Sequence, residues 1–275
     1  MAQKVWMITG TSRGIGANLA KAVLAAGDKL VATARRTQAL EHLGDHDNLL
    51  SITLDVTSEP QAKEAVDGAL NRFGSIDVLV NNAGYGLLGA IEESSAEEVE
   101  RLYRTNVFGL LNVTRAVLPS MRSRRAGHIM NISSVAGYSA YPGWGAYSST
   151  KFAIEGLSET LHVELAPLGI HVTVVEPGFF RTDFLDSASL RETSLRIPDY
   201  AETVGKMREF AVGYNHQQPG DPTKLAQALL QIANAPEPPL RLPLGTDTLK
   251  RMAEKNAMVD RETAQWHALA ASTDY

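Results

Sequence analysis

A tyrosine and a lysine stand four positions apart in the stretch YSSTK, residues 147–151. Residues with this separation share one face of a helix, so Tyr147 and Lys151 would be neighbours one turn apart. An ammonium group beside a phenol favours the phenolate and lowers the phenol's pKa from its usual value of about 10. Such a tyrosine could act as a general acid or base near neutral pH. Taken alone, the same spacing also fits an amphipathic helix with a surface lysine.

A glycine-rich turn, TGTSRGIG at residues 9–16, follows an apolar stretch and opens a helical pattern. Gly10, Gly14 and Gly16 would let the backbone turn tightly and approach a ligand, while the start of the helix attracts a pyrophosphate. The spacing differs from the commoner G-x-G-x-x-G fingerprint. Its place between a strand and a helix nevertheless predicts a dinucleotide-binding turn.

Short apolar stretches alternate with helical patterns through the first 176 residues. Because these stretches are apolar throughout, they indicate strands of a parallel sheet that is covered on both faces. They lie at residues 5–9, 29–34, 49–54, 76–81, 128–133 and 171–176. Helical patterns occur at 14–26, from the cap at Ser58 and Pro60, and from a capping box at Ser95 and Glu98 towards residue 122. Six strands joined by crossover helices predict an α/β fold with a doubly wound parallel sheet and helices on both faces.

The alternation of apolar stretches and helical patterns ends in the last third of the sequence. Residues 179–220 mix aromatic and charged side chains, and the proline-rich stretch 236–245 reads as extended, followed by a helical pattern. We predict a single domain over residues 1–275, in which 179–220 form a substrate-binding lid and 236–275 form a C-terminal extension.

Composition excludes several classes of function. The 275 residues carry a net charge of −5, which argues against a general attraction to nucleic acid or acidic membranes. The chain has no cysteine and therefore no disulfide or thiolate chemistry, and its histidines follow no metal-ligand spacing. It shows neither a signal peptide nor an apolar stretch of the roughly 20 residues that a membrane span needs. We predict a cytoplasmic protein with no metal site, no membrane span and no nucleic-acid partner.

Six motifs occur together in the order and spacing of the short-chain dehydrogenase/reductase family, which the chain resembles over about residues 4–182. The motifs are TGTSRGIG, NNAG (81–84), RTNVFG (104–109), NISSVAG (131–137), YSSTK and EPGFFRT (176–182). The resemblance implies a Rossmann-type sheet of about seven strands, a nicotinamide cofactor and a catalytic tyrosine. The chain looks most like the subgroup related to 17β-hydroxysteroid and retinol dehydrogenases. Because family members often form dimers or tetramers, we expect a homodimer or homotetramer.

The resemblance assigns catalytic roles to Asn106, Ser134, Tyr147 and Lys151. Ser134 has the family's spacing to the tyrosine, whereas the competing Ser133 would point to the opposite face of a strand. Ser134 would hydrogen-bond a substrate carbonyl oxygen, and Tyr147 would exchange a proton with it. Lys151 would lower the pKa of the tyrosine and bind the nicotinamide ribose. Asn106 would hold a water in a proton relay, or would be a polar residue in the middle of a helix whose hydrogen bonds are satisfied.

The phosphate state of the cofactor is predicted from charge. Family members that prefer NAD usually end the second strand in an acidic residue, but Ala34 stands there and Arg35 and Arg36 follow. Arg13 lies within the glycine turn. Guanidinium groups bind phosphate oxygens in pairs and keep their charge, so a 2′-phosphate and hence NADP(H) are expected. Arg36 alone is more simply a solvated turn residue.

The remaining cofactor contacts follow from the same resemblance. Asp55 and Val56 are expected at the adenine, although Asp55 could instead satisfy nearby backbone. Asn82 is expected to be structural first, and Thr182 to fix the carboxamide or cap a helix. The full set of expected cofactor-binding residues is Gly10, Ser12, Arg13, Gly14, Ile15, Gly16, Arg35, Asp55, Val56, Asn82, Ala83, Gly84, Tyr147, Lys151, Pro177, Gly178 and Thr182.

Apolar side chains flank the predicted catalytic tyrosine and follow residue 178, where they would line a substrate pocket or pack the lid onto the domain. They are Tyr138, Tyr141, Trp144, Phe179, Phe180, Phe184, Leu185 and Tyr214, with the stretch GYGLLG at 84–89. We therefore predict an NADP(H)-dependent oxidoreductase that interconverts a small hydrophobic ketone or aldehyde and its alcohol. Two alternatives are an NADP(H)-binding regulatory protein without turnover and a sugar-nucleotide epimerase-like enzyme. The first has no use for the four catalytic residues together, and the second usually carries a longer C-terminal substrate domain.

Overall fold

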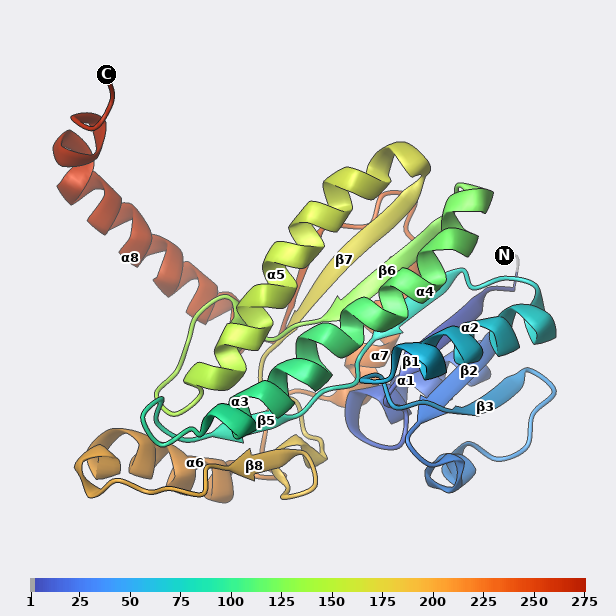
Figure 1. Cartoon of the computed structure of the whole chain (residues 1–275), viewed down its shortest axis with the longest axis horizontal. Coiled ribbons are helices and arrows are strands. Elements are labelled where there is room, and N and C mark those ends of the chain that lie inside the picture. Colours follow the sequence, from blue (N-terminus) through green and yellow to red (C-terminus); the bar gives the residue numbers. More distant parts are fainter. Residues whose placement is uncertain (1–2) are drawn as a thin grey trace.

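The apolar stretches of the sequence form one parallel sheet through the centre of the molecule (Figure 1). The structure is a computed structural model and describes residues 3–275. The strands are β1 (Val5–Thr9), β2 (Lys29–Ala34), β3 (Leu49–Thr53), β4 (Val78–Asn81), β6 (Gly127–Ile132), β7 (Ile170–Pro177) and β9 (Arg241–Leu244). Six of them match the predicted strands, and β9 lies in the proline-rich stretch that was predicted to be extended. The predicted Rossmann-type α/β fold is confirmed.

The order of the strands places a functional site at one edge of the sheet. The strand order is β3-β2-β1-β4-β6-β7-β9, and every neighbouring pair is parallel. The chain first moves outward from β1 to β3 and then continues on the other side of β1 with β4. In open sheets of this kind, ligands bind beyond the carboxyl ends of the strands at the point where the direction changes. The segments that follow β1 and β4 are therefore expected to meet a ligand.

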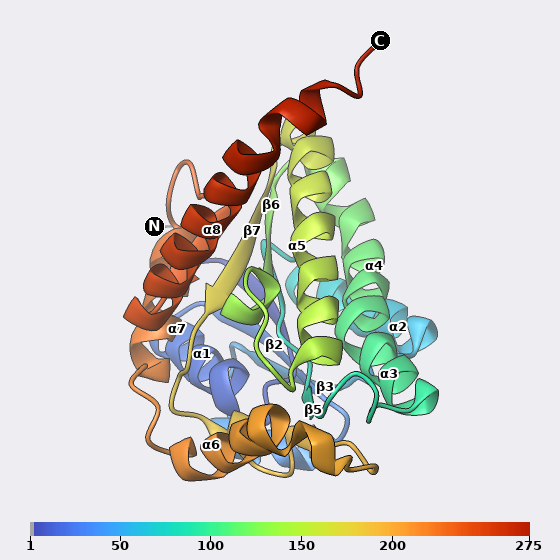
Figure 2. The ribbon, with the colours of Figure 1, turned by 90° about the vertical axis from the view of Figure 1, so that its left-hand side faces the viewer.

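Helices cover both faces of the sheet (Figures 1 and 2). One face carries α1 (Gly14–Ala25) and α7 (Pro222–Ala233), and the other carries α2 (Glu59–Phe73), α4 (Gly109–Arg124) and α5 (Gly145–Leu165). Alternate residues of a strand serve the two faces: Ile8 packs with Leu19 and Leu229, whereas Met7 packs with Val117. Burial of each such side chain stabilises the fold by about 1.5–3 kcal/mol.

The helix starts that were read from the sequence are confirmed. The Ser58 side chain accepts a hydrogen bond from the backbone N–H of Gln61 at the start of α2. Ser95 and Glu98 form the reciprocal capping box at the start of α3 (Ala96–Tyr103). Between α3 and α4 the helix widens into one π turn at Arg104–Phe108, a feature often found at functional sites.

A small second sheet joins the lid segment to the rest of the domain, and the sequence did not predict it. Strand β5 (Gly86–Leu88) pairs in parallel with β8 (Leu190–Glu192), which lies in the predicted lid. The lid also contains α6 (Lys206–Tyr214), which lies near β5 at the end of the molecule where α5 begins (Figure 2). Residues 179–220 are therefore fixed to the domain by backbone hydrogen bonds as well as by side chains.

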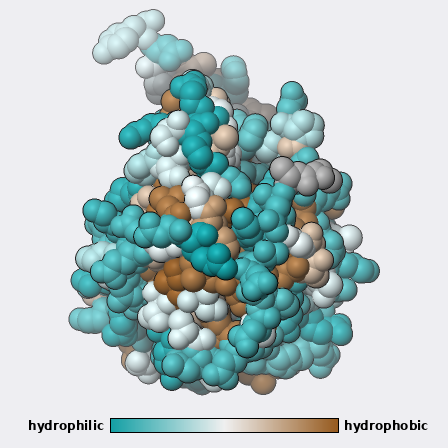
Figure 3. All heavy atoms as spheres, turned by 90° about the vertical axis from the view of Figure 1, so that its right-hand side faces the viewer, coloured by the Kyte–Doolittle hydropathy of each residue, from teal (hydrophilic) through white to brown (hydrophobic). Residues whose placement is uncertain are grey.

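The last helix, α8 (Thr246–Ala271), begins beside β9 and then projects from the body of the molecule (Figures 1 and 2). Within residues 3–275, none of the helices is long and apolar enough to cross a membrane. On the side that carries α2 and the edge strand β3, hydrophobic side chains gather near the middle of the face and hydrophilic ones surround them (Figure 3). This matches the half-exposed state of β3, which has a neighbour on one side only.

Candidate active site

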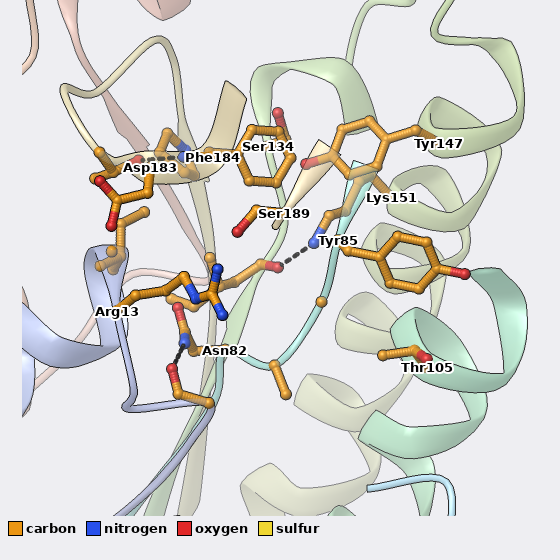
Figure 4. A pocket seen from close by; sticks show the side chains of 18 of the residues that line it. Arg13, Asn82, Tyr85, Thr105, Ser134, Tyr147, Lys151, Asp183, Phe184 and Ser189 are labelled. Atoms are coloured by element: carbon orange, nitrogen blue, oxygen red, sulfur yellow. Dashed lines mark hydrogen bonds between the residues drawn. The ribbon is translucent and has the colours of Figure 1, made fainter. Parts of the chain in front are cut away.

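One cavity of about 680 Å³ lies beyond the carboxyl ends of the strands. It collects residues that directly follow six of the strands, from Gly10 after β1 to Gly178 after β7. All but two of the predicted site residues line it; the exceptions are Gly16 and Asn106. Figure 4 shows side chains from the glycine turn, the end of β4, the lid and α5 facing the same space.

The glycine turn has a backbone conformation and close contacts that only glycine permits. Gly10 and Gly14 have φ angles of +71° and +58°, in the left-handed region that disfavours side chains. A Cβ atom on Gly16 would lie 2.5 Å from the Asn82 side-chain nitrogen and would also strike the Gly10 carbonyl. Asn82 donates hydrogen bonds from that nitrogen to the carbonyls of Thr9 and Gly10, at 2.9 and 3.0 Å. Gly16 and Asn82 therefore build the turn, and its concave side stays free for a ligand.

Two arginines face one end of the cavity. Arg13 and Arg35 both line it with Ala34, whereas Arg36 does not. In the described part of the chain, no carboxylate lies within ion-pair distance of Arg13 or Arg35. Asp55 also lines this end, but its carboxylate accepts two hydrogen bonds from Thr57, at 2.9 and 2.7 Å. The two free guanidiniums suit an anion such as a phosphate.

Tyr147 and Lys151 enter the other end of the cavity from the same face of α5 (Figure 4). The Lys151 ammonium lies 5.6 Å from the centre of the tyrosine ring and donates a hydrogen bond to the Ile132 carbonyl at 2.8 Å. Burial lowers the pKa of Lys151 to about 8, although the charge of Glu155 opposes this. The predicted pair of neighbours is present.

The pKa of Tyr147 departs from the value that its spacing to the lysine suggested. Burial raises the pKa of the phenol above its ordinary value, and a hydrogen bond with Ser134 opposes the rise. The expectation of a lowered pKa came from helix spacing, which carries no information about desolvation. Tyr147 is only 6% exposed, so in this structure it is a protonated group that is ready to donate.

The neighbouring serines have different surroundings. A hydrogen bond with Ser134 lowers the pKa of Tyr147, and one with Ser133 lowers the pKa of Glu155. The two hydroxyl groups therefore interact with different side chains. This arrangement favours Ser134 as the serine that accompanies the tyrosine. The hydroxyl of Ser133 is buried and points towards Gly137 and Glu155.

Asn106 lies in the π turn and uses its side chain entirely on protein atoms. Its amide donates to the carbonyl of Tyr85 and to the hydroxyl of Thr150, at 3.0 and 3.2 Å. Its oxygen accepts from the backbone N–H of Tyr85 at 3.1 Å. The side chain thereby ties the segment after β4 to α5, as the structural alternative for this residue expected. The water relay stays a prediction.

Other residues predicted to contact the cofactor also line the cavity, and their contacts with a cofactor stay predictions. Thr182 lines the cavity, and its hydroxyl also caps a short helical turn by accepting from the N–H of Phe184. Pro177 ends β7, and Gly178 follows it where a Cβ atom would collide with Asp247. All three residues line the same cavity as Tyr147, and Thr182 lies close to Gly14 of the glycine turn.

Aromatic side chains cover the reacting end of the cavity. The ring of Phe184 in the lid lies 6.3 Å from that of Trp144 and 5.7 Å from that of Tyr147. The predicted residues that line the cavity are Tyr141, Trp144, Phe179, Phe180, Phe184 and Leu185. Tyr138 and Tyr214 do not: Tyr138 hydrogen-bonds Asn256, and Tyr214 packs within the lid. The wall around Tyr147 is therefore largely apolar.

Three arginines that were not predicted as site residues also reach this cavity. They are Arg101 on α3, Arg104 at the start of the π turn and Arg191 on β8, and Arg101 and Arg191 lie near Tyr85. Burial raises the pKa of Tyr85, and the charges of these two arginines oppose the rise. Arg191 comes to the cavity because β8 pairs with β5, opposite Leu87. Strands of three residues give no periodic signal, so the sequence could not indicate this position.

One group of metal-ligating side chains occurs among residues 3–275, although the sequence predicted no metal site. Asp183, Asp186 and His216 bring their ligand atoms within 4.8 Å of one another in the lid. Asp186 already accepts a hydrogen bond from Asn215 and lies 3.3 Å from His216. These contacts join the two ends of the lid and are sufficient to account for the group.

Comparison with known proteins relates the whole chain to oxidoreductases. A family model described as short chain dehydrogenase matches residues 4–193. The chain is 36% identical over 273 residues to the oxidoreductase BOA17 of Botryotinia fuckeliana, covering 98% of this chain and 99% of that protein. It is 37% identical to a 3-ketodihydrosphingosine reductase of Bacteroides thetaiotaomicron, covering 89% of each.

Solved structures give the same relation. A short-chain dehydrogenase from Streptomyces avermitilis is 42% identical, with a TM-score of 0.93 over 99% of both chains. ElxO with NADP bound is 28% identical, with a TM-score of 0.75 over 90% of this chain and all of its own. A short-chain dehydrogenase/reductase from Burkholderia phymatum in complex with NAD is 26% identical, with a TM-score of 0.83 over 94% of this chain and 95% of its own.

Proposed function

Because this chain belongs to the short-chain dehydrogenase family of oxidoreductases, we propose that it is an NADP(H)-dependent enzyme that interconverts a hydrophobic ketone or aldehyde and its alcohol. One observation carries the proposal. Ser134, Tyr147 and Lys151 meet at one end of a cavity whose other end presents Arg13 and Arg35 without carboxylate partners. A regulatory protein that only bound the cofactor would need the end of the cavity with the two arginines, but it would not need the end with Ser134, Tyr147 and Lys151.

The residues around the glycine turn fit a dinucleotide. The concave backbone at Gly10 and Gly14 suits a pyrophosphate, because a side chain at either position would be strained. Arg13 and Arg35 would hold a 2′-phosphate, and Lys151 would hold the nicotinamide ribose. A bound nicotinamide cofactor supplies or accepts the hydride. Since similar structures hold either NADP or NAD, the choice of NADP(H) rests on the two arginines.

The protein's own groups would handle the oxygen of the substrate. Ser134 would donate a hydrogen bond to the carbonyl oxygen and stabilise the negative charge that develops there. Tyr147, protonated and buried, would donate its proton to the same oxygen when a ketone or aldehyde is reduced. Lys151, as an ammonium ion, would favour the phenolate that remains. In alcohol oxidation the proton would move in the opposite direction.

The walls of the cavity support a hydrophobic substrate. Trp144 and Phe184 lie against Tyr147, and burial of an apolar substrate between such rings contributes about 25 cal/mol per Å² of its surface. One relative is a reductase of 3-ketodihydrosphingosine, which is consistent with this chemical class. The closer likeness to 17β-hydroxysteroid and retinol dehydrogenases stays a prediction, as do a cytoplasmic location and a homodimer or homotetramer.

The proposal is tested by following the oxidation of NADPH and NADH in the presence of hydrophobic ketones and aldehydes. The wild-type protein should oxidise NADPH faster than NADH with at least one of them. Tyr147→Phe should lose about 100-fold or more of this activity because the proton donor is gone, with an unchanged thermal unfolding midpoint. The proposal fails if the protein binds NADPH but reduces none of the compounds, or if Tyr147→Phe stays active.

A further inference from the structure

Two carboxyl groups are buried beyond Lys151, one helical turn further along the same face of α5 and on the neighbouring strand β7. Glu155 lies one helical turn after Lys151, and Glu176 lies on β7; they are 5% and 0% exposed. A single nitrogen of Arg241, on β9, donates to both, at 2.5 Å to Glu155 and 2.7 Å to Glu176. The other terminal nitrogen of Arg241 donates to Glu159, whose side chain is 55% exposed.

This pair of carboxyl groups binds a proton more tightly than an isolated carboxyl group does. One guanidinium cannot neutralise three carboxylates, and like charges this close in a buried site favour protonation of one of them. Burial raises the pKa of Glu155, and burial together with the charge of Glu155 raises the pKa of Glu176 to about 7. Each carboxyl group also has one buried oxygen without a hydrogen-bond partner among the described residues, which leaves a place for that proton.

Glu155 is in close contact with the part of the chain that carries Lys151. A Cβ atom on Gly137 would lie 2.5 Å from the Ser133 hydroxyl, 3.0 Å from Cβ of Lys151 and 3.1 Å from the free oxygen of Glu155. These three groups therefore converge on one glycine and leave no room for a side chain there. Burial lowers the pKa of Lys151, and the charge of Glu155 opposes this.

The groups that face Glu155 can be named element by element. Lys151 and Glu159 face it from α5, Ser133 from the end of β6, Glu176 from β7 and Arg241 from β9. Glu155 also lines a second cavity of about 420 Å³, which Tyr138 and, from α8, Lys255 and Asp260 line as well. Among the carboxylates, Glu155 is the one whose charge raises the pKa of Lys151.

We propose that Glu155 is a positioning residue of this enzyme: its carboxylate keeps Lys151 in the ammonium form, and Glu176 and Arg241 hold that carboxylate in place behind the lysine. The role assigned to Lys151 in turnover rests on the proposed function. The charge of Lys151 does not rest on it and can be measured directly.

The first experiment follows the titration of Lys151 by NMR in protein labelled with ¹³C at the lysine Cε position. The Lys151 signal is identified by its absence from Lys151→Arg. In Glu155→Gln the midpoint of this titration should fall by about 1 pH unit, because a charge one turn away is lost. In Glu159→Gln it should move by less than about 0.3 units, since that carboxylate is exposed and one turn further away.

Kinetics provide the second readout. In Glu155→Gln, kcat/KM for NADPH-dependent reduction should fall about fivefold at pH 8 and change little at pH 6, because the alkaline limb of the profile moves with Lys151. Glu155→Asp retains the charge and should restore most of the loss. If Glu155→Gln alone does not fold, Glu155→Gln/Glu176→Gln removes the like charges while leaving two amide oxygens for Arg241, and it should give the same shift.

The outcomes separate the two proposals. An unchanged Lys151 midpoint in Glu155→Gln overturns this inference, whether or not the protein has activity. A loss of kcat/KM by the same factor at every pH, or a Glu155→Asp variant that behaves like Glu155→Gln, assigns the residue a structural role only. A shifted midpoint in a protein that reduces no carbonyl compound supports the inference and rejects the proposed function.

Discussion

Arg35 stands directly after β2, where it reaches the cavity with no carboxylate beside it. If it binds a 2′-phosphate, Arg35→Asp should lower kcat/KM for NADPH by about 100-fold, because a charge-assisted contact is replaced by repulsion. The value for NADH should change by less than about threefold. Arg36→Asp is the matched control, since Arg36 does not line the cavity, and it should leave both values near those of the wild type. Equal losses with both cofactors in Arg35→Asp would reject this role.

Site residues that are recognised by a fixed separation along the chain could be predicted from the sequence. Tyr147 and Lys151 share a helix face at a fixed separation, and the family resemblance indicated Ser134 by its spacing to the tyrosine. Glu155 and Glu176 were missed, although Glu155 repeats the four-residue spacing from Lys151. Their importance comes from burial and from Arg241, which arrives from a distant strand. Burial also reversed the expected direction of the pKa of Tyr147, and spacing alone cannot report burial.

The glycine turn and helix α5 offer a matched pair of glycine substitutions. Gly16→Ala should destabilise the protein by at least about 2 kcal/mol and weaken NADPH binding, because the new methyl group collides with Asn82. Gly156→Ala, within α5, has no atom within 4 Å of the new methyl group and should stabilise the protein by about 0.5–1 kcal/mol. Urea unfolding and NADPH titration measure both effects. Losses of similar size in the two variants would contradict this account of the turn.

Glu93 accepts three hydrogen bonds, and two of them fasten the lid to the domain. Its buried carboxylate accepts from the backbone N–H groups of Ala90 and Ile197, both at 2.8 Å, and from Arg208 at 2.5 Å. Burial raises the pKa of Glu93, but the bonds from Arg208, Ile197 and Ala90 outweigh this and hold it at about 2. The attachment is therefore complete above about pH 4.5 and is lost as the pH falls towards 2.

Glu93→Gln should loosen the lid at neutral pH. The charged contact with Arg208 is lost, so hydrogen exchange of the backbone amides of residues 193–208 should become about tenfold faster, while amides of the central strands keep their rates. Glu92→Gln is the control, because Glu92 is exposed and accepts a single hydrogen bond from the lid, donated by the Tyr200 hydroxyl. The idea would be wrong if exchange in the lid did not change, or changed equally in both variants.

Elements with a strong local pattern were predicted, and those that depend on distant partners were not. The central strands are continuous apolar stretches, and the starts of α2 and α3 carry their own capping residues. The pairing of β5 with β8 joins two three-residue strands about 100 positions apart, neither of which shows a period. The proline-rich stretch was correctly predicted to be extended. Its position as the seventh strand depends on β7, and the sequence of the stretch itself does not indicate it.

The buried pair of carboxyl groups should make the stability of the whole molecule depend on pH. The pKa of Glu176 is about 7 in the folded protein, above its ordinary value of 4.5. Between these two pH values Glu176 is ionised in the unfolded chain and protonated in the folded protein. Raising the pH through this range therefore favours the unfolded chain. The contribution of Glu176 to stability is therefore complete below about pH 4.5 and declines as the pH rises to about 7.

Glu176→Gln removes this titration. The difference in free energy of unfolding between Glu176→Gln and the wild type should move in favour of the variant from pH 5 to pH 8, as measured by urea unfolding at each pH. The exposed Glu164 provides the control, and Glu164→Gln should remain parallel to the wild type. A difference between Glu176→Gln and the wild type that stays constant across this range would show that the pair does not retain a proton.

The last strand of the sheet has a consequence for how the protein is made. Strand β9 begins about 60 residues after β7 ends, which corresponds to roughly 3–12 s of synthesis on the ribosome. Until β9 leaves the exit tunnel, the nascent chain has an open edge at β7, and Glu176 lacks the arginine that β9 brings to it. Every residue of the proposed catalytic set has already been translated by then. A ribosome that stalls in this interval would display a nearly finished enzyme with an unpaired strand, the state in which a chaperone would find it.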